Sequence, residues 1–346
     1  MLSYLQAVVI ALLQGVTELF PVSSLGHSVL VPAWLGGSWQ RLVTQSSQGD
    51  SGSSFYLAFI VSLHVATAVA LLLFFRRDWV RIIGAFVRSA RRSLVERRLS
   101  VRDTDEKLAW LIVFATVPVG ITGLALEHVF RTLFAKPLAA SVFLFVNGLL
   151  LLAAERLRRT TATARKTGVS ASVERRVAGM IPVSAAVAVS PTGLLTAGVG
   201  GAVAVESVAD DGLASDERLA RLSWGSGVAI GSFQVLALLA GISRSGVTMA
   251  GGLWRGLSHE DAARFAFLLA TPVIFAAGVL KLPSLAGPAA ANIHGQIAVG
   301  FVVAGVAAYL SVRYLTRYFT TRTLTPFAVY CLLAGAASVL RFAFVG

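Results

Sequence analysis

The sequence is poor in charged residues and nearly free of cysteine. Only 14% of its 346 residues are charged and 56% are hydrophobic, whereas about one quarter of a soluble domain is charged. The mean hydropathy is +0.75. These values exclude a soluble globular enzyme and predict a multi-pass protein of the cell membrane. The single cysteine, Cys331, cannot form an intrachain disulfide, so the fold does not depend on an oxidising compartment.

The N-terminus lacks a basic region and a small-residue cleavage site, so we expect residues 1–13 to belong to the mature protein. The net charge of +13 would suggest nucleic acid as the partner of a soluble protein. Here most Lys and Arg residues lie between hydrophobic runs, which indicates topology signals and contact with anionic lipid head groups. The expected partner is therefore the lipid bilayer, with no nucleic acid.

Six apolar runs are long enough to cross a bilayer, which takes about 20 residues. They cover residues 55–75, 108–126, 138–155, 262–281, 294–315 and 326–345. Two further pairs are shorter and interrupted by polar strings: 2–13 with 19–35, and 222–240 with 246–257. Such interrupted segments at corresponding places in two halves predict re-entrant helix pairs in an inverted repeat. The predicted fold is an all-α polytopic membrane protein in which the two pairs meet at mid-membrane.

The predicted repeats are residues 1–156 and 222–346, integrated into one membrane domain. Arginine-rich segments, above all 76–102, are predicted to be cytoplasmic loops, whereas 282–293 has no Lys or Arg. Both termini and a loop over 36–54 are then outside, and the two re-entrant pairs enter from opposite faces.

Residues 157–221 form a predicted insertion of unknown role. Its apolar part, 177–205, is long enough to span, but Pro and Gly interrupt it and a crossing would invert every later loop. We interpret it as a hairpin or an interfacial segment. The acidic cluster that follows it is predicted to be solvated and comprises Asp210, Asp211, Asp216 and Glu217.

Two polar strings, Pro21–His27 and Gly241–Thr248, carry the candidate chemistry. An offset of 220 positions aligns Gln14 with Gln234, Ser23 with Ser243 and Gly26 with Gly246. Polar and ionisable residues at membrane depth are functional candidates because they are costly unless they face a polar cavity.

The first string offers a carboxylate and a candidate nucleophile. Glu18 follows Gln14 by four residues, so both project from one helix face. At that depth the carboxylate needs a cation, a proton or a cationic side chain, and a structural ion pair with an arginine is the alternative. Ser24 and His27 share a face if a helix begins near Ser24, a nucleophile–base arrangement. A plain N-cap at Ser23 or Ser24 is the competing interpretation, and both can hold.

The second string has the character of a phosphate cradle. Arg244 offers a planar fork for bidentate phosphate binding, and the following helix N-terminus adds positive partial charge. Its glycines permit a tight turn and its hydroxyls can donate: Gly241, Gly246, Ser243, Ser245 and Thr248. In the span 55–75, His64 and Thr67 share a face, and either a plain interhelix hydrogen bond or a supporting role fits them.

These strings resemble a known family. Gln14–His27 (QGVTELFPVSSLGH) and Gly241–Thr248 (GISRSGVT) are similar to the two consensus blocks of the undecaprenyl-diphosphate phosphatase family of the bacitracin-resistance type. The family's H-x-G-T element is matched by His64–Thr67, with Ala66 in place of glycine. The resemblance runs from about residue 2 to 343, except for 36–54 and 157–221.

The resemblance implies a membrane hydrolase that removes the terminal phosphate of a polyprenyl diphosphate and yields the monophosphate carrier lipid. It also implies a divalent cation, Mg²⁺ or Ca²⁺, and a site reached from the outer face; a homodimer is compatible with it. Carried over by position, Glu18 and Gln14 match the acidic metal motif, Ser24 and His27 the catalytic pair, and Arg244 the phosphate-binding arginine. Ser23 and the second string line the phosphate site. Gln14 stands where many members have glutamate.

Two other functions fit parts of this sequence. A polyprenyl-phosphate transporter would suit the inverted repeat and needs no nucleophile. Lipid phosphatases of the acid-phosphatase type share similar short strings but require a histidine six residues after the arginine. Position 250 is Ala250, which excludes them.

Overall fold

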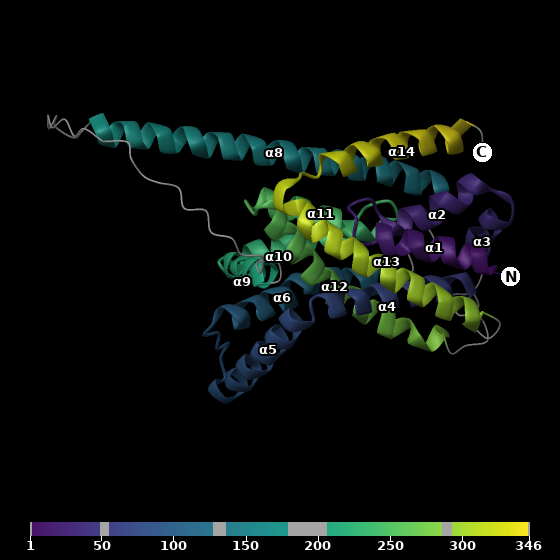
Figure 1. Ribbon diagram of the computed structural model, residues 1–346, viewed down its shortest axis with the longest axis horizontal. Helices are drawn as coiled ribbons and strands as arrows, with labels where there is room; N and C mark the ends of the chain where they lie inside the picture. Colours follow the sequence, from purple (N-terminus) through teal and green to yellow (C-terminus); the bar gives the residue numbers. More distant parts are fainter. Residues whose placement is uncertain (1, 49–54, 127–135, 179–205, 286–292, 345–346) are drawn as a thin grey trace, which may run out of the picture.

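The computed structural model describes residues 2–48, 55–126, 136–178, 206–285 and 293–344, and these residues form helices and connecting turns without any strand (Figure 1). The first half contains α1 (Tyr4–Thr17), α2 (Ser24–Leu35), α3 (Gly37–Gln48), α4 (Phe55–Phe74), α5 (Arg76–Glu96), α6 (Thr104–Ala125) and α8 (Pro137–Ala178). The second contains α9 (Glu206–Ala220), α10 (Trp224–Ser232), the 3₁₀ helix η1 (Phe233–Leu238), α11 (Arg244–Trp254), α12 (His259–Leu285), α13 (His294–Thr321) and α14 (Thr325–Phe344).

The membrane-spanning helices match the predicted runs. Among the described residues, five helices are long and apolar enough to cross: α6, α12, α13, α14 and the Pro137–Thr160 part of α8. The sixth predicted span corresponds to α4, which joins α5 at a bend of 86°. The short helices α1 and α2, and α10 with α11, correspond to the re-entrant pairs. The predicted all-α polytopic fold is confirmed.

The inverted repeat is visible in how the second helix of each pair begins. The Ser23 hydroxyl accepts a hydrogen bond from the Gly26 amide at 3.2 Å, and the Ser243 hydroxyl accepts one from the Gly246 amide at 3.2 Å. Each serine therefore caps its helix in the same way, which satisfies an amide that the helix itself leaves without a partner. The 220-residue offset thus describes a repeated backbone element.

Small residues let the re-entrant helix α1 pack closely on α13. A Cβ built on Gly15 would lie 2.5 Å from the carbonyl oxygen of Ala304, so a larger residue would separate the two helices. The contact between α8 and α14 uses Gly148 and Gly335 in the same way, each facing the backbone of the other helix. In a membrane, lipid tails are as apolar as the side chains, so the hydrophobic effect does not drive helices together. Small residues let the helices approach closely, and van der Waals packing then stabilises their association.

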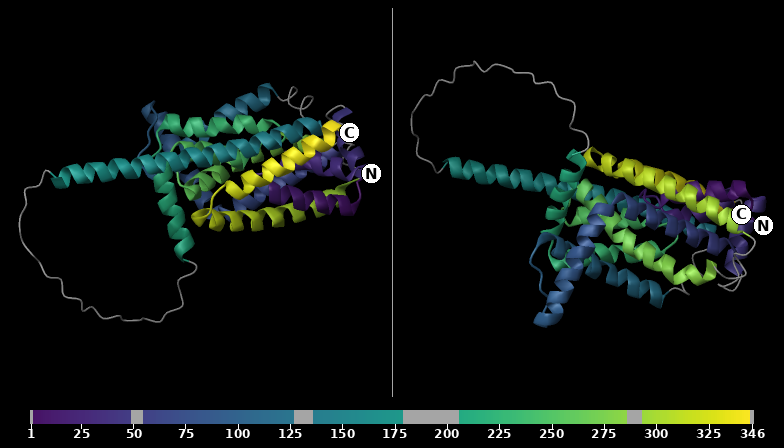
Figure 2. Two further views of the ribbon diagram at one scale, coloured as in Figure 1. Left: turned by 90° about the horizontal axis from the view of Figure 1, so that it is seen from above. Right: turned by 60° about the horizontal axis from the view of Figure 1, so that its bottom comes forward.

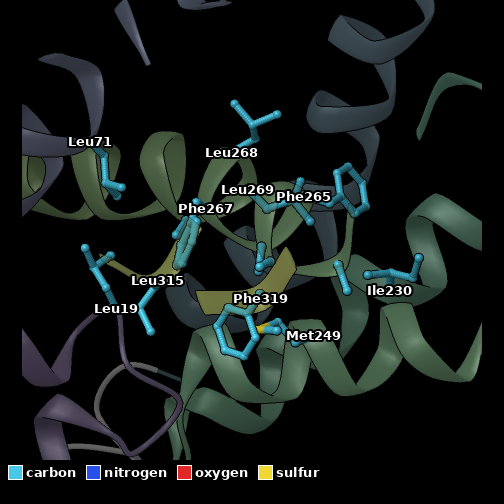
Figure 3. Close-up of a cluster of buried hydrophobic side chains, with 14 of the residues drawn as sticks. Leu19, Leu71, Ile230, Met249, Phe265, Phe267, Leu268, Leu269, Leu315 and Phe319 are labelled. Atoms are coloured by element: carbon cyan, nitrogen blue, oxygen red, sulfur yellow. The ribbon is translucent and has the colours of Figure 1, made fainter. Parts of the chain in front are cut away.

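A buried apolar cluster joins the re-entrant elements to the spans (Figure 3). Leu19 from the first polar turn and Met249 from α11 belong to the same cluster as Phe265 and Phe267 of α12 and Phe319 of α13. All five side chains are almost completely buried. Their dense packing holds both polar turns against the same long helices.

Three connecting segments differ from the sequence-based predictions. Residues 76–102 were expected to be a loop, but most of them form α5, because their apolar residues recur at helical spacing. Residues 36–54 were expected to be an external loop, but they contain α3; residues 49–54 lie outside the described part. Within 157–221, α8 continues to Ala178 and α9 follows, whereas 179–205 lies outside the described residues (Figure 2).

The acidic cluster was also expected to be solvated, and this is wrong for Asp216. The side chain of Asp216 is buried and forms ion pairs with Arg81 and with Arg264, the latter at 2.7 Å. Arg264 also pairs with Asp78 at 2.9 Å. These pairs attach α9 to α5 and α12, so the end of the insertion is a structural element. Glu217 is exposed as expected, and the side chains of Asp210 and Asp211 lie outside the described part.

Candidate active site

The two polar turns meet in the middle of the molecule. A Cβ on Gly26 would lie 2.9 Å from the Cα of Gly241, so the turns approach at van der Waals distance. The hydroxyls of Ser243 and Ser245 both donate to the Phe20 carbonyl at 3.3 Å. The predicted convergence of the two strings is therefore found in the structure.

Backbone geometry explains two residues in these turns. Gly241 has φ of +115°, and a Cβ there would lie 2.4 Å from the Ala140 carbonyl oxygen, so only glycine fits. Ser23 has φ of 70°, a left-handed conformation that a serine rarely adopts. Such strain concentrates at functional sites, where the surrounding structure holds it in place.

Asn147 of α8 joins the two turns and was not identified from the sequence. Its amide nitrogen donates to the Pro21 carbonyl at 3.1 Å, and its amide oxygen accepts from the Ser243 amide at 3.0 Å. The side chain is completely buried. One amide therefore sets the distance between the first and second halves of the site. A single amide within an apolar span was the sequence signal for it.

Glu18 is the centre of the polar contacts. Its Oε2 accepts hydrogen bonds from Gln14 Nε2 at 2.9 Å and from the Ser24 hydroxyl. His64 Nε2 lies 3.5 Å from the same oxygen, so His64 reaches the carboxylate from α4. Glu18 is 7% exposed and His64 is partly exposed, which leaves the cluster open on one side. A carboxylate that accepts a serine proton can act as a general base.

Arg244 brings positive charge to this carboxylate from the second half. It begins α11 and lies close enough to Glu18 for an electrostatic interaction. Its Nη1 is buried and has no hydrogen-bond partner among the described residues. A buried guanidinium nitrogen without a partner is costly, and an anion such as a phosphate oxygen would satisfy it.

His27 is held away from Ser24. Its Nδ1 lies 2.7 Å from the Ser23 carbonyl oxygen, and its Nε2 lies 2.7 Å from the hydroxyl of Tyr330 on α14. No hydrogen bond joins Ser24 to His27 within the described part of the chain. In this structure the partner of the Ser24 hydroxyl is Glu18. Tyr330 had no distinguishing signal in the sequence, because an aromatic residue near a span end is common.

Two predicted hydroxyls are used within their own helices. Thr248 donates to the Arg244 carbonyl at 2.7 Å, and Thr67 donates to the Leu63 carbonyl at 3.0 Å. Both side chains are buried. The polar atoms closest to a bound phosphate would therefore come from Arg244 and from the start of α11.

A divalent cation fits the donors at Glu18. Within the described residues no group of three His, Cys, Asp or Glu side chains could enclose a metal ion. However, Gln14 Oε1 is buried and has no hydrogen-bond partner there, and it belongs to the side chain that contacts Glu18. Mg²⁺ binds in such sites through one or two protein oxygens, with water and substrate phosphates completing its coordination.

Comparison with known proteins identifies relatives along the whole chain. Residues 7–193 and 172–337 match the family described as Bacitracin resistance protein BacA. The two matched regions fit the two repeats of the structure. A protein of Frankia alni named undecaprenyl-diphosphatase 2 is 59% identical over 346 residues, covering 99% of this chain and 98% of its own length.

Two further relatives carry similar names. The undecaprenyl-diphosphatase of Mycolicibacterium paratuberculosis is 54% identical, covering 99% of this chain and 98% of its own length. Undecaprenyl-diphosphatase 2 of Chromobacterium violaceum is 38% identical, covering 97% of this chain and 98% of its own length. Each of these matches therefore covers nearly the whole length of both proteins.

Proposed function

This chain belongs to the family of bacitracin resistance protein BacA, and we propose that it hydrolyses undecaprenyl diphosphate at the site around Glu18. The products are undecaprenyl monophosphate and inorganic phosphate. One observation carries this proposal. The Glu18 carboxylate, which accepts a hydrogen bond from the Ser24 hydroxyl, lies near Arg244, whose Nη1 has no partner in the described residues. The carboxylate lies in one repeat and the arginine in the other. Hydrolysis of a diphosphate needs both groups, because the carboxylate can remove a proton from the nucleophile and the arginine can neutralise phosphate charge.

The proposed chemistry begins with the terminal phosphate at Arg244. The guanidinium and the N-terminus of α11 hold its oxygens and stabilise the charge that develops on the phosphoryl group. The nucleophile is the Ser24 hydroxyl or a water beside it, and its proton passes to Glu18. The bond from the terminal phosphorus to the bridging oxygen breaks, and the monophosphate lipid leaves. If Ser24 attacks, water then releases the phosphate from the serine.

The other site residues support these groups. Gln14 and His64 hold the Glu18 carboxylate in place, since both contact its Oε2. His27, fixed between Ser23 and Tyr330, keeps the first turn of α2 in position. Glu18 and Gln14 would hold a divalent cation, and when bound it would neutralise phosphate charge.

We propose an orientation in which the site opens toward the outer face. The charge distribution supports the sidedness of the helices, because arginine-rich segments favour the cytoplasm. Both chain ends lie at one end of the molecule, whereas α5 and α9 lie at the other (Figure 1). The termini are then outside, and α5 with its arginines is cytoplasmic.

Phosphate release in detergent tests this function. The purified protein is expected to release inorganic phosphate from undecaprenyl diphosphate, and a chelator is expected to lower the rate by at least about 100-fold. Added Mg²⁺ or Ca²⁺ should restore the rate. Activity that is unchanged by chelation would overturn the cation assignment. Counterflow of undecaprenyl phosphate across vesicles without any phosphate release would favour the transporter and overturn the hydrolase.

A further inference from the structure

An apolar groove lies outside the active site, on the surface between α1 and α13. Its volume is about 570 Å³. Its lining is almost entirely apolar and includes Leu12 and Val16 of α1 and Val302 and Val306 of α13. These four side chains are between 39% and 62% exposed. In a membrane protein such a surface faces lipid chains, and a groove in it can hold one of them.

A second groove continues the first toward the end of α13. Its volume is about 480 Å³, and it shares Leu310 and Tyr314 with the apolar groove. Three of its remaining residues are Arg313, Arg317 and Arg322, all exposed. No ion pair or side-chain hydrogen bond of these three guanidiniums is formed within the described part of the chain. Three unneutralised positive charges therefore lie at the mouth of an apolar channel.

The combined shape matches a membrane phospholipid. The apolar groove extends along α13 from Val302 to Tyr314, which is about 18 Å of helix at 1.5 Å per residue. One leaflet contributes half of the roughly 30 Å hydrocarbon core, about 15 Å, so an acyl chain would occupy most of the length of the groove. A polyprenyl chain is far longer than the groove. The arginines lie where the phosphate of that lipid would be.

We propose that this continuous groove binds an anionic glycerophospholipid. Its phosphate head group contacts Arg313, Arg317 and Arg322, and one acyl chain lies between α1 and α13. Basic pockets beside membrane helices attract anionic lipids, and each charge near the surface strengthens the attraction. The three arginines of this groove are not part of the phosphate site around Arg244, and the proposal does not depend on the proposed reaction.

The groove also contacts the active-site turn. Phe20 lines the groove and stacks on Tyr314, with ring centroids 6.0 Å apart and an interplanar angle of 7°. The carbonyl of Phe20 accepts the hydroxyls of Ser243 and Ser245. A lipid in the groove would therefore support the turn that joins the two halves of the active site.

Lipid binding to the purified protein in detergent tests the proposal, with phosphatidylglycerol and phosphatidylcholine as probes and native mass spectrometry as the readout. We expect phosphatidylglycerol to bind at least tenfold more tightly. Replacing the three arginines by glutamine should weaken its binding by about 100-fold, since each charge contributes about fivefold. The matched control replaces Arg76, Arg77 and Arg91, which are exposed on α5, and should weaken binding less than threefold.

A second variant tests the apolar part without changing charge. Val306→Trp fills the groove and should weaken phosphatidylglycerol binding by about tenfold, whereas Val329→Trp, on exposed α14 surface, should leave it unchanged. Equal losses for the groove and control arginines, or equal binding of both lipids, would overturn the proposal. Preferential binding of undecaprenyl phosphate that depends on the same arginines would also overturn it.

Discussion

Glu18→Gln is expected to lower kcat for phosphate release from undecaprenyl diphosphate by at least about 1,000-fold. The substitution keeps the size of the side chain and its contacts with Gln14, but it removes the negative charge. The amide cannot accept the proton of the nucleophile, and without the negative charge it attracts a cation more weakly than the carboxylate does. Initial rates of phosphate release from the purified variant, at saturating substrate, measure the effect.

Glu155→Gln is the matched control for this prediction. Glu155 is a buried carboxylate of α8 that contacts His259 Nε2 at 2.8 Å and, within the described residues, forms no hydrogen bond or ion pair with the active-site turns. Loss of this negative charge should lower thermal stability more than kcat, because Glu155 pairs with His259 outside the active site. An active Glu18→Gln variant, with kcat within tenfold of the wild type, would contradict the assignment of Glu18.

Asn147→Leu is expected to lower both stability and activity. The substitution leaves the Ser243 amide without a partner, and it leaves the Pro21 carbonyl only the weak Cys331 thiol donor at 3.8 Å. A buried polar group without a partner costs about 1–3 kcal/mol, and the weakened carbonyl adds a smaller cost. The unfolding free energy should therefore fall by about 2–4 kcal/mol. Because the distance between the two turns is no longer fixed, kcat should fall by about 100-fold while KM changes less. Thermal unfolding and steady-state kinetics of the purified variant measure these effects.

Ser141→Ala provides the comparison on the same helix. Ser141 is completely buried, but among the described residues its hydroxyl donates only to the Pro137 carbonyl one turn earlier. Its loss should leave kcat within about threefold of the wild type. If Asn147→Leu lowered stability but left kcat unchanged, Asn147 would be a structural residue and its positioning role would be refuted.

The sequence predicted most of the proposed site because charged and polar residues are conspicuous in an apolar chain. Glu18, Ser24 and Arg244 stand out there, and the 220-residue offset indicated that their segments meet. The sequence could not show which of these side chains are hydrogen-bonded to one another. Which groups contact one another depends on side-chain geometry, so the pairing of Ser24 with Glu18 became visible only in the structure.

The fold was predictable for a related reason. The spans are long apolar runs, and the re-entrant pairs are marked by Pro and Gly. The helix α5 was missed because its arginines suggested a solvated loop, although Ile82, Ala85 and Ser89 are buried against the bundle at helical spacing. Asp216 was missed because its partners, Arg81 and Arg264, are more than 40 residues away in the sequence. Long-range ion pairs of this kind leave no local pattern.

The central claim is that the two halves of the chain act on one phosphate group. A double-variant comparison of kcat/KM for phosphate release tests it most directly, using the mild substitutions Glu18→Asp and Arg244→Lys. Because both side chains contact the same reacting group, we expect the loss in the double variant to be at least about fivefold smaller than the product of the two single losses. Losses that multiply would mean that Glu18 and Arg244 act independently, which would contradict a single shared site.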